Sequence, residues 1–164
     1  MTASKILTRA ELLERAAQRR AADQRLVLAN GAFDLLHVGH VRYLEAARDE
    51  GDWLAVAVNS DASVRRAKGP GRPIIPEGER AEIVAALECV DAVVLFEEDS
   101  PAALIEELEP DVHAKGSDYS AEGVPERAVV ARYGGRTAIV GDPKDHATTD
   151  LIDRISKAFP ERRS

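Results

Sequence analysis

The chain has 164 residues, of which 45% are hydrophobic and 31% charged, and its formal net charge is -7. These values are typical of one soluble globular domain, and the acidic balance excludes a nucleic-acid binder that depends on overall positive charge. The single cysteine, Cys89, excludes an intrachain disulfide and disfavours a cysteine-based metal cluster. No apolar run approaches membrane-spanning length and no signal-peptide core precedes residue 8, so we expect a cytoplasmic protein without a membrane partner.

In chain order, the hydrophobic pattern predicts helices that alternate with strands. A capping box formed by Thr8 and Glu11 opens a helix that ends near residue 20. Strands are expected at residues 26–29, 53–58, 92–96, 111–114 and 137–140, and helices after residue 40, after residue 61, over residues 77–88, after residue 100, near residues 125–133 and after residue 148. In the last helix, Leu151, Ile152, Ile155 and Phe159 have the spacing of core residues, and Ile83 is expected to face inward from the helix at 77–88.

The expected strands are continuous apolar runs without polar alternation, which is typical of parallel strands covered on both faces. Together with the alternating helices, this predicts an α/β fold with a doubly wound five-stranded parallel sheet of the Rossmann-like kind. We expect residues 1–24 to form a helical extension packed on the body, and residues 25–160 to form the functional domain. In such folds the ligand binds beyond the carboxyl ends of the strands.

The segment from Asn30 to His40 joins the first long strand to a helix, and it contains His37 and His40 three residues apart. A helix start carries unpaired N–H groups and the positive end of the peptide dipoles, and Gly39 lets a ligand approach the backbone closely. The pattern therefore indicates a phosphate site. Two partly buried helix-start histidines, or a zinc site that adds His113, remain the alternatives from these residues alone.

Further polar residues follow other strands and should meet the turn at the same edge of the sheet. Lys68 and Arg72 lie in a Gly/Pro-rich loop that could close over phosphates, with a solvated charged surface as the alternative. Arg80 stands near a helix start, where a cation is unfavourable unless an anion binds there. Lys115 and Asp118 follow a strand and could contact a phosphate or stabilise a turn.

Residues 31–40 resemble the G-x-F-D-x-x-H-x-G-H signature of the cytidylyltransferase-like nucleotidyltransferases. The family's second signature, a Ser/Thr pair that opens a helix, resembles Thr148 and Thr149 after His146; an ordinary helix cap is the alternative, and it is compatible with phosphate binding at the same helix start. Residues 58–63, 68–73, 96–101 and 115–119 resemble one branch of the family, the D-glycero-D-manno-heptose 1-phosphate adenylyltransferases, and we expect a stand-alone version without a kinase half.

Two departures from the family pattern bear on this resemblance. Ala32 stands where that branch more usually has Cys or Val, and the Arg-Thr-Glu of the cytidylyltransferase signature is absent. The second departure favours the heptose branch. We hypothesise that Lys144 supplies the missing charge.

The resemblance implies transfer of AMP from ATP to heptose 1-phosphate, giving ADP-heptose and pyrophosphate for lipopolysaccharide core or other surface glycans. It also implies a homodimer, and Mg²⁺ carried on the triphosphate with no dedicated protein ligands. Together with the residue chemistry it assigns catalytic roles to His37, His40, Lys68 and Arg80, nucleotide binding to Asn30, Gly31, Ala32, Phe33, His37, Gly39, His40, Lys115, Asp118, His146, Thr148 and Thr149, and substrate binding to Asp34, Asn59, Asp61 and Arg72.

For Asp34, the expected contribution is to fix its turn by accepting backbone N–H groups rather than to act as a base. Three other functions stay open at this point: a cytidylyltransferase for glycerol 3-phosphate or a related phosphate, a non-catalytic nucleotide-binding protein, and a zinc hydrolase.

Overall fold

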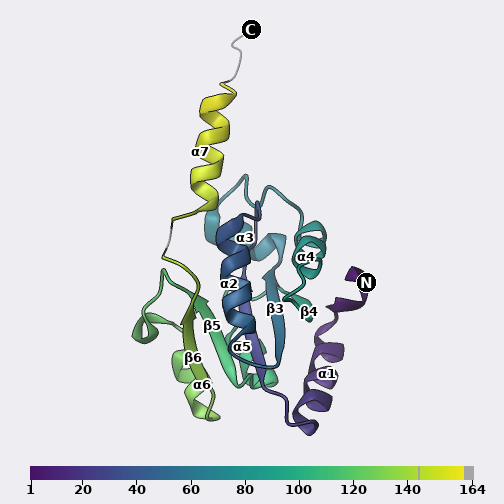
Figure 1. Cartoon of the computed structure of the whole chain (residues 1–164). Coiled ribbons are helices and arrows are strands. Elements are labelled where there is room, and N and C mark those ends of the chain that lie inside the picture. Colours follow the sequence, from purple (N-terminus) through teal and green to yellow (C-terminus); the bar gives the residue numbers. More distant parts are fainter. Residues whose placement is uncertain (144, 161–164) are drawn as a thin grey trace.

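The computed structural model describes residues 1–143 and 145–160, and it confirms a doubly wound α/β fold with helices on both faces of a parallel sheet (Figure 1). The strands are β1 (Ile6–Leu7), β2 (Leu26–Gly31), β3 (Trp53–Asn59), β4 (Ala92–Phe96), β5 (Val112–Gly116) and β6 (Arg136–Val140). The helices are α1 (Arg9–Ala21), α2 (Val38–Arg48), α3 (Asp61–Lys68), α4 (Glu77–Ala85), α5 (Ala102–Leu108), α6 (Arg127–Arg132) and α7 (Thr148–Ala158), with 3-10 turns η1 (Thr2–Lys5) and η2 (Ala121–Gly123).

The sheet has six strands in the order β1-β4-β3-β2-β5-β6, one more than the sequence predicts. The additional strand is β1, a two-residue edge strand in which Ile6 pairs with Val93 and Leu7 with Val94. Two residues carry no readable periodicity, so this strand exists only through its pairing with β4. The segment before α1 is therefore part of the sheet.

Two apolar cores enclose the sheet, one on each face, which explains the unbroken apolar runs of the strands. One face packs against α2 and α4 through residues such as Leu44 and Val84, which are 0% exposed. The opposite face packs against α1, α5 and α6, with Leu12 and Ile105 fully buried. The predicted capping box is present, because the Thr8 hydroxyl accepts the Glu11 N–H and the Glu11 carboxylate accepts the Thr8 N–H at 2.7 Å.

Helix α7 differs from its prediction, because it extends away from the body and contains no buried residue (Figure 1). Ile155 is 53% and Phe159 79% exposed, so the expectation that this stripe packs into the core is wrong. Ile83 on α4 is also exposed, at 39%. Within residues 1–143 and 145–160, no helix has both the length and the apolarity needed to cross a membrane.

The winding of the chain creates a switch point beside β2. From β2 the chain proceeds through β3 to β4 on one side of the sheet, and then returns to form β5 and β6 on the other side. The connections leaving β2 and β5 thus diverge at neighbouring carboxyl ends, which leaves a crevice between them. The turn of residues 30–40 leaves β2 at this crevice.

Candidate active site

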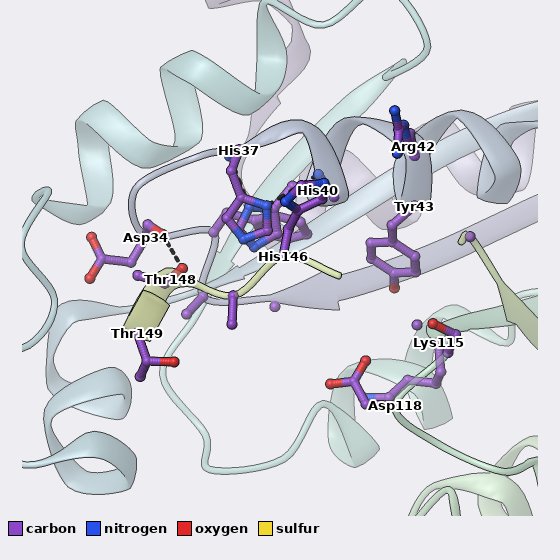
Figure 2. A pocket seen from close by; sticks show the side chains of 18 of the residues that line it. Asp34, His37, His40, Arg42, Tyr43, Lys115, Asp118, His146, Thr148 and Thr149 are labelled. Carbon is purple, nitrogen blue, oxygen red and sulfur yellow. Dashed lines mark hydrogen bonds between the residues drawn. The ribbon is translucent and has the colours of Figure 1, made fainter. Parts of the chain in front are cut away.

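A cavity of about 530 Å³ lies at the switch point, over the carboxyl ends of β2, β3, β5 and β6 (Figure 2). Most of the predicted site residues line it, namely Asn30, Gly31, Ala32, Phe33, Asp34, His37, Gly39, His40, Asn59, Lys68, Arg72, Lys115, Asp118, His146, Thr148 and Thr149. The described structure thus gathers five chain segments into one pocket. Its volume is in the range of small-molecule sites.

The two histidines of the turn form the N-terminal cap of α2, as an imidazole version of a capping box. His37 Nδ1 accepts the Gly39 N–H at 3.1 Å, and His40 Nδ1 accepts the His37 N–H at 3.3 Å. A neutral imidazole that accepts at one nitrogen carries its proton on the other. Both rings therefore present Nε2–H as a donor, and both line the cavity.

The environment keeps both imidazoles uncharged at neutral pH. Burial, together with the neighbouring His37 and Lys68, lowers the pKa of His40 to about 4. Burial and the nearby His146 also lower the pKa of His37. The rings stack with centroids 3.9 Å apart, an arrangement that favours neutral rings because two charged ones would repel each other.

Gly39 is required by the packing of these rings. A Cβ at this position would lie 3.0 Å from the His37 ring and 3.3 Å from the His146 Cβ. The sequence predicted that a ligand approaches the backbone at Gly39; in the structure the groups close to Gly39 are the side chains of His37 and His146. His146, whose ring centroid is 6.2 Å from that of His37, brings the segment before α7 against the turn.

The start of α7 lies against the turn and lines the same cavity (Figure 2). The Thr148 hydroxyl donates to the Asp34 carbonyl at 2.8 Å, which joins α7 to the turn. Ala147 is the N-cap residue, and no side chain in the described part of the protein caps this helix. The threonine hydroxyls therefore do not form an ordinary helix cap. The N–H groups in the first turn of α7 stay available for an anion, as at other uncapped helix starts.

Asp34 holds a distant loop against the turn. Its carboxylate is 1% exposed and accepts Arg72 Nε at 2.8 Å, the Ile74 N–H at 2.9 Å and the Ile75 N–H at 3.0 Å. Burial alone would raise the pKa of Asp34, but the Ile75 and Ile74 N–H groups and the Arg72 guanidinium together lower it below its usual value. Asp34 thus accepts backbone N–H groups as the sequence predicts, although their source is the loop before α4 rather than its own turn.

Arg72 and Lys68 approach the cavity from that loop and from the end of α3. The Arg72 side chain is 13% exposed, and its Nη2 is buried without a hydrogen-bond partner among the described residues. A buried, unsatisfied guanidinium nitrogen at a cavity wall is a donor suited to an anionic oxygen.

Arg80 lies beneath the cavity rather than in its wall, in contrast to the prediction that it contacts phosphate. The guanidinium is 0% exposed, and it donates to the Ile75 carbonyl at 2.8 Å, to the Ala32 carbonyl and to Asp61 at 2.9 Å. These bonds tie together the turn, the loop before α4 and the start of α3. Asp61 likewise does not line the cavity, and its carboxylate serves Arg80.

On the β5 side the cavity is bounded by Lys115, Asp118 and Tyr119. Burial lowers the pKa of Lys115, whose Nζ lies 4.5 Å from the centroid of the Tyr119 ring. His113, two residues earlier on β5, is 0% exposed and bonds through Nε2 to Asn30 Oδ1 at 2.9 Å. Within residues 1–143 and 145–160, no three His, Cys, Asp or Glu residues are grouped so as to hold a metal ion.

No role was predicted for several lining residues, namely Arg42, Tyr43, Ser117, Tyr119 and Asp142 among others, although Ser117 and Tyr119 lie in the segment 115–119 that resembles the heptose branch. Tyr43 follows His40 by three residues on α2, so helical spacing was a signal that it lies on the same side. The ion pair between Arg42 and Asp142, at 2.9 Å, joins α2 to the segment after β6 and had no signal in the sequence. Lys144, hypothesised to supply a charge, lies outside the described residues.

Comparison with known proteins identifies relatives of the whole domain. A family model described as cytidylyltransferase-like matches residues 28–153. The bifunctional protein HldE of Geobacter metallireducens is 53% identical over 142 residues, which is 87% of this chain and 29% of that protein. The protein of the same name from Trichlorobacter lovleyi is 48% identical over 160 residues, 98% of this chain and 33% of that protein. The chain thus spans about a third of the length of these curated relatives.

Among solved structures, a lipopolysaccharide core biosynthesis protein from Thermoplasma volcanium GSS1 aligns with a TM-score of 0.64 at 29% identity. The alignment covers 73% of this chain and 98% of the other. The family model includes the turn, the cavity and most of α7. The chain belongs to the cytidylyltransferase-like family.

Proposed function

We propose that this protein transfers AMP from ATP to D-glycero-D-manno-heptose 1-phosphate, giving ADP-heptose and pyrophosphate. The single observation that carries the nucleotidyl-transfer part is the pair of neutral imidazole Nε2–H donors at the start of α2, which line the same cavity as the start of α7. The acceptor is supported by the resemblance of residues 58–63, 68–73 and 115–119 to the heptose branch, and by a structural relative named for lipopolysaccharide core biosynthesis.

In the proposed reaction, an oxygen of the sugar phosphate attacks the α-phosphorus of ATP in line. The new bond joins that oxygen to the α-phosphorus, and the bond to the bridging α–β oxygen breaks, so that pyrophosphate leaves with the electron pair. The attacking phosphate is already ionised, so no strong base is needed. Catalysis then depends on alignment and charge stabilisation, which fixed donors provide.

The residues divide between the two substrates. His37 and His40 donate Nε2–H to the α- and β-phosphate oxygens. The β/γ end is held by the backbone N–H groups of Thr148 and Thr149 at the start of α7, together with the Thr149 hydroxyl, because the Thr148 hydroxyl donates to the Asp34 carbonyl. Arg72 Nη2 and Lys68, with Asn59, bind the phosphate of the acceptor on the β3 side of the cavity.

The remaining residues support these contacts. Asn30, Lys115, Asp118 and His146 bind the nucleotide on the β5 side. Arg80 and Asp61 position the turn and the loop from below, and Asp34 holds the loop in place. The triphosphate would carry Mg²⁺, which would offset part of its charge, and Asp118 is the cavity carboxylate that would lie nearest to that role.

A screen for pyrophosphate release tests the proposal. ATP, CTP, GTP and UTP are each offered with heptose 1-phosphate, glycerol 3-phosphate and other sugar and polyol phosphates. We expect release with ATP and heptose 1-phosphate, reduced by roughly 10²–10³-fold in a His40→Ala variant. Arg132→Ala, a change at an exposed side chain remote from the cavity, is the matched control.

Each other outcome identifies a rival function. Release with CTP and glycerol 3-phosphate would mean a cytidylyltransferase, and nucleotide binding without release for any pair would mean a binding protein. From the family resemblance we further propose that the protein is cytoplasmic and forms a homodimer. Light scattering after gel filtration measures the mass in solution and so tests the oligomeric state.

A further inference from the structure

His113 is buried beneath the cavity and hydrogen-bonds to Asn30, which lines it; no contact with a ligand is assigned to the histidine. His113 pairs in register with Leu28 on β2, and Asn30 lies two residues further along the same strand. Side chains two residues apart on a strand share a face, so the imidazole and the amide lie on the same side of the sheet. Their bond joins His113 Nε2 and Asn30 Oδ1 at 2.9 Å.

The chemistry of this bond fixes both groups. An amide oxygen only accepts, so His113 Nε2 carries the proton and Nδ1 is an acceptor. Burial, with Lys115 nearby, lowers the pKa of His113 to about 3, so the ring is neutral at physiological pH. In the same register on β6 stands Thr137; its hydroxyl and His113 Nδ1 are both buried without a hydrogen-bond partner among the described residues.

The same bond sets the orientation of the Asn30 amide. With Oδ1 occupied by the imidazole N–H, the amide NH₂ is the end left for the cavity, which Asn30 lines beside Gly31 and Ala32. An amide turned the other way would present its oxygen to an anionic ligand and repel it. The bond to His113 therefore selects the orientation that suits a nucleotide.

We propose that His113 is a positioning residue of the nucleotide site, holding the Asn30 amide so that its NH₂ donates to an oxygen of the bound nucleotide. This rests on the proposed function only in that the cavity binds a nucleotide, and adenylyl transfer is not required for it. The inference concerns the β5 side of the cavity, where a buried imidazole within a strand acts through its neighbour without touching the ligand.

The experiment measures the Kd of the full chain for ATP and for CTP by titration calorimetry without an acceptor, so failure of the transfer reaction does not affect it. In His113→Leu the amide is no longer held, and we expect the Kd of the bound nucleotide to rise about tenfold. In His113→Gln the side-chain NH₂ can replace Nε2–H, and we expect the Kd to return close to wild type. Asn30→Asp puts a carboxylate oxygen in the cavity and should raise the Kd more than His113→Leu does.

A double-mutant comparison separates positioning from a general loss of structure. If His113 acts through Asn30, His113→Leu adds little to the Kd of an Asn30→Ala variant. Val112→Ala, a core change on the opposite face of β5, controls for lower stability and should leave the Kd unchanged.

Three results would overturn the inference. The first is a wild-type Kd in His113→Leu, and the second is a loss that adds fully to that of Asn30→Ala. The third is an equal rise in Kd in the Val112→Ala control. A wild-type chain that binds neither nucleotide would overturn this inference and the proposed function together.

Discussion

Each imidazole of the turn caps α2 through Nδ1 and presents Nε2–H to the cavity. At His37, two different substitutions can remove these two functions one at a time. His37 Nδ1 accepts the Gly39 N–H at 3.1 Å as a helix cap, while its Nε2–H is the proposed phosphate donor. Asparagine has an oxygen near the place of Nδ1 but nothing at Nε2, so His37→Asn keeps the cap and removes the donor. Glutamine reaches the Nε2 position but does not cap, so His37→Gln keeps the donor and removes the cap.

The two variants should therefore fail in opposite ways. Loss of one fixed donor costs roughly 10²–10³-fold in turnover, so we expect His37→Asn to be stable and nearly inactive. Loss of the cap costs about 1 kcal/mol, so His37→Gln should lose about that much stability and keep most of its turnover. Urea unfolding and pyrophosphate release, measured on both proteins, provide the comparison. Full activity in His37→Asn would refute the donor role, and equal stability of the two variants would refute the cap role.

Three further predictions concern buried charge, pH and α7. Arg80→Met should lower the free energy of unfolding, measured with urea, by about 3–5 kcal/mol, because Asp61 and two backbone carbonyls lose their hydrogen-bond donor. A variant that is fully stable yet inactive would instead mean that Arg80 contacts the substrate. The pKa of His40 is lowered to about 4 and that of His113 to about 3 from 6.5, so below pH 6.5 the unfolded chain binds protons that the folded protein does not. The free energy of unfolding should therefore fall as pH drops from 6.5 towards 4, and it should fall less steeply in His113→Gln. Urea titrations in which the free energy of unfolding does not change over this pH range would contradict the lowered histidine pKa values. Ile155→Glu should change the free energy of unfolding by no more than about 0.5 kcal/mol, because the side chain is 53% exposed. A decrease of more than about 2 kcal/mol, together with a lower mass by light scattering, would mean that a second chain covers Ile155.

The sequence by itself determined the layers of the fold and the place of the site. Apolar runs such as residues 53–58 are typical of parallel strands buried on both faces, and the helices between them follow from their spacing. Because parallel strands end at the same edge, the turn of residues 30–40 and the segments after β5 and β6 had to meet there. The helix start at Thr8 was likewise local, since a cap and its partner lie within three residues. By contrast, α2 begins at Val38, before the start after residue 40 that the sequence predicts.

The tertiary structure alone decided what each side chain contacts. Periodicity identifies an apolar face but not what covers it, so the stripe of α7 has core spacing and yet lies exposed. Arg80 has the sequence position of a phosphate ligand, but its partners are two carbonyls and a carboxylate brought together by folding. Asp34 and His113 also gain their tasks from groups distant in the chain, and such pairings depend on chain packing that no local pattern records.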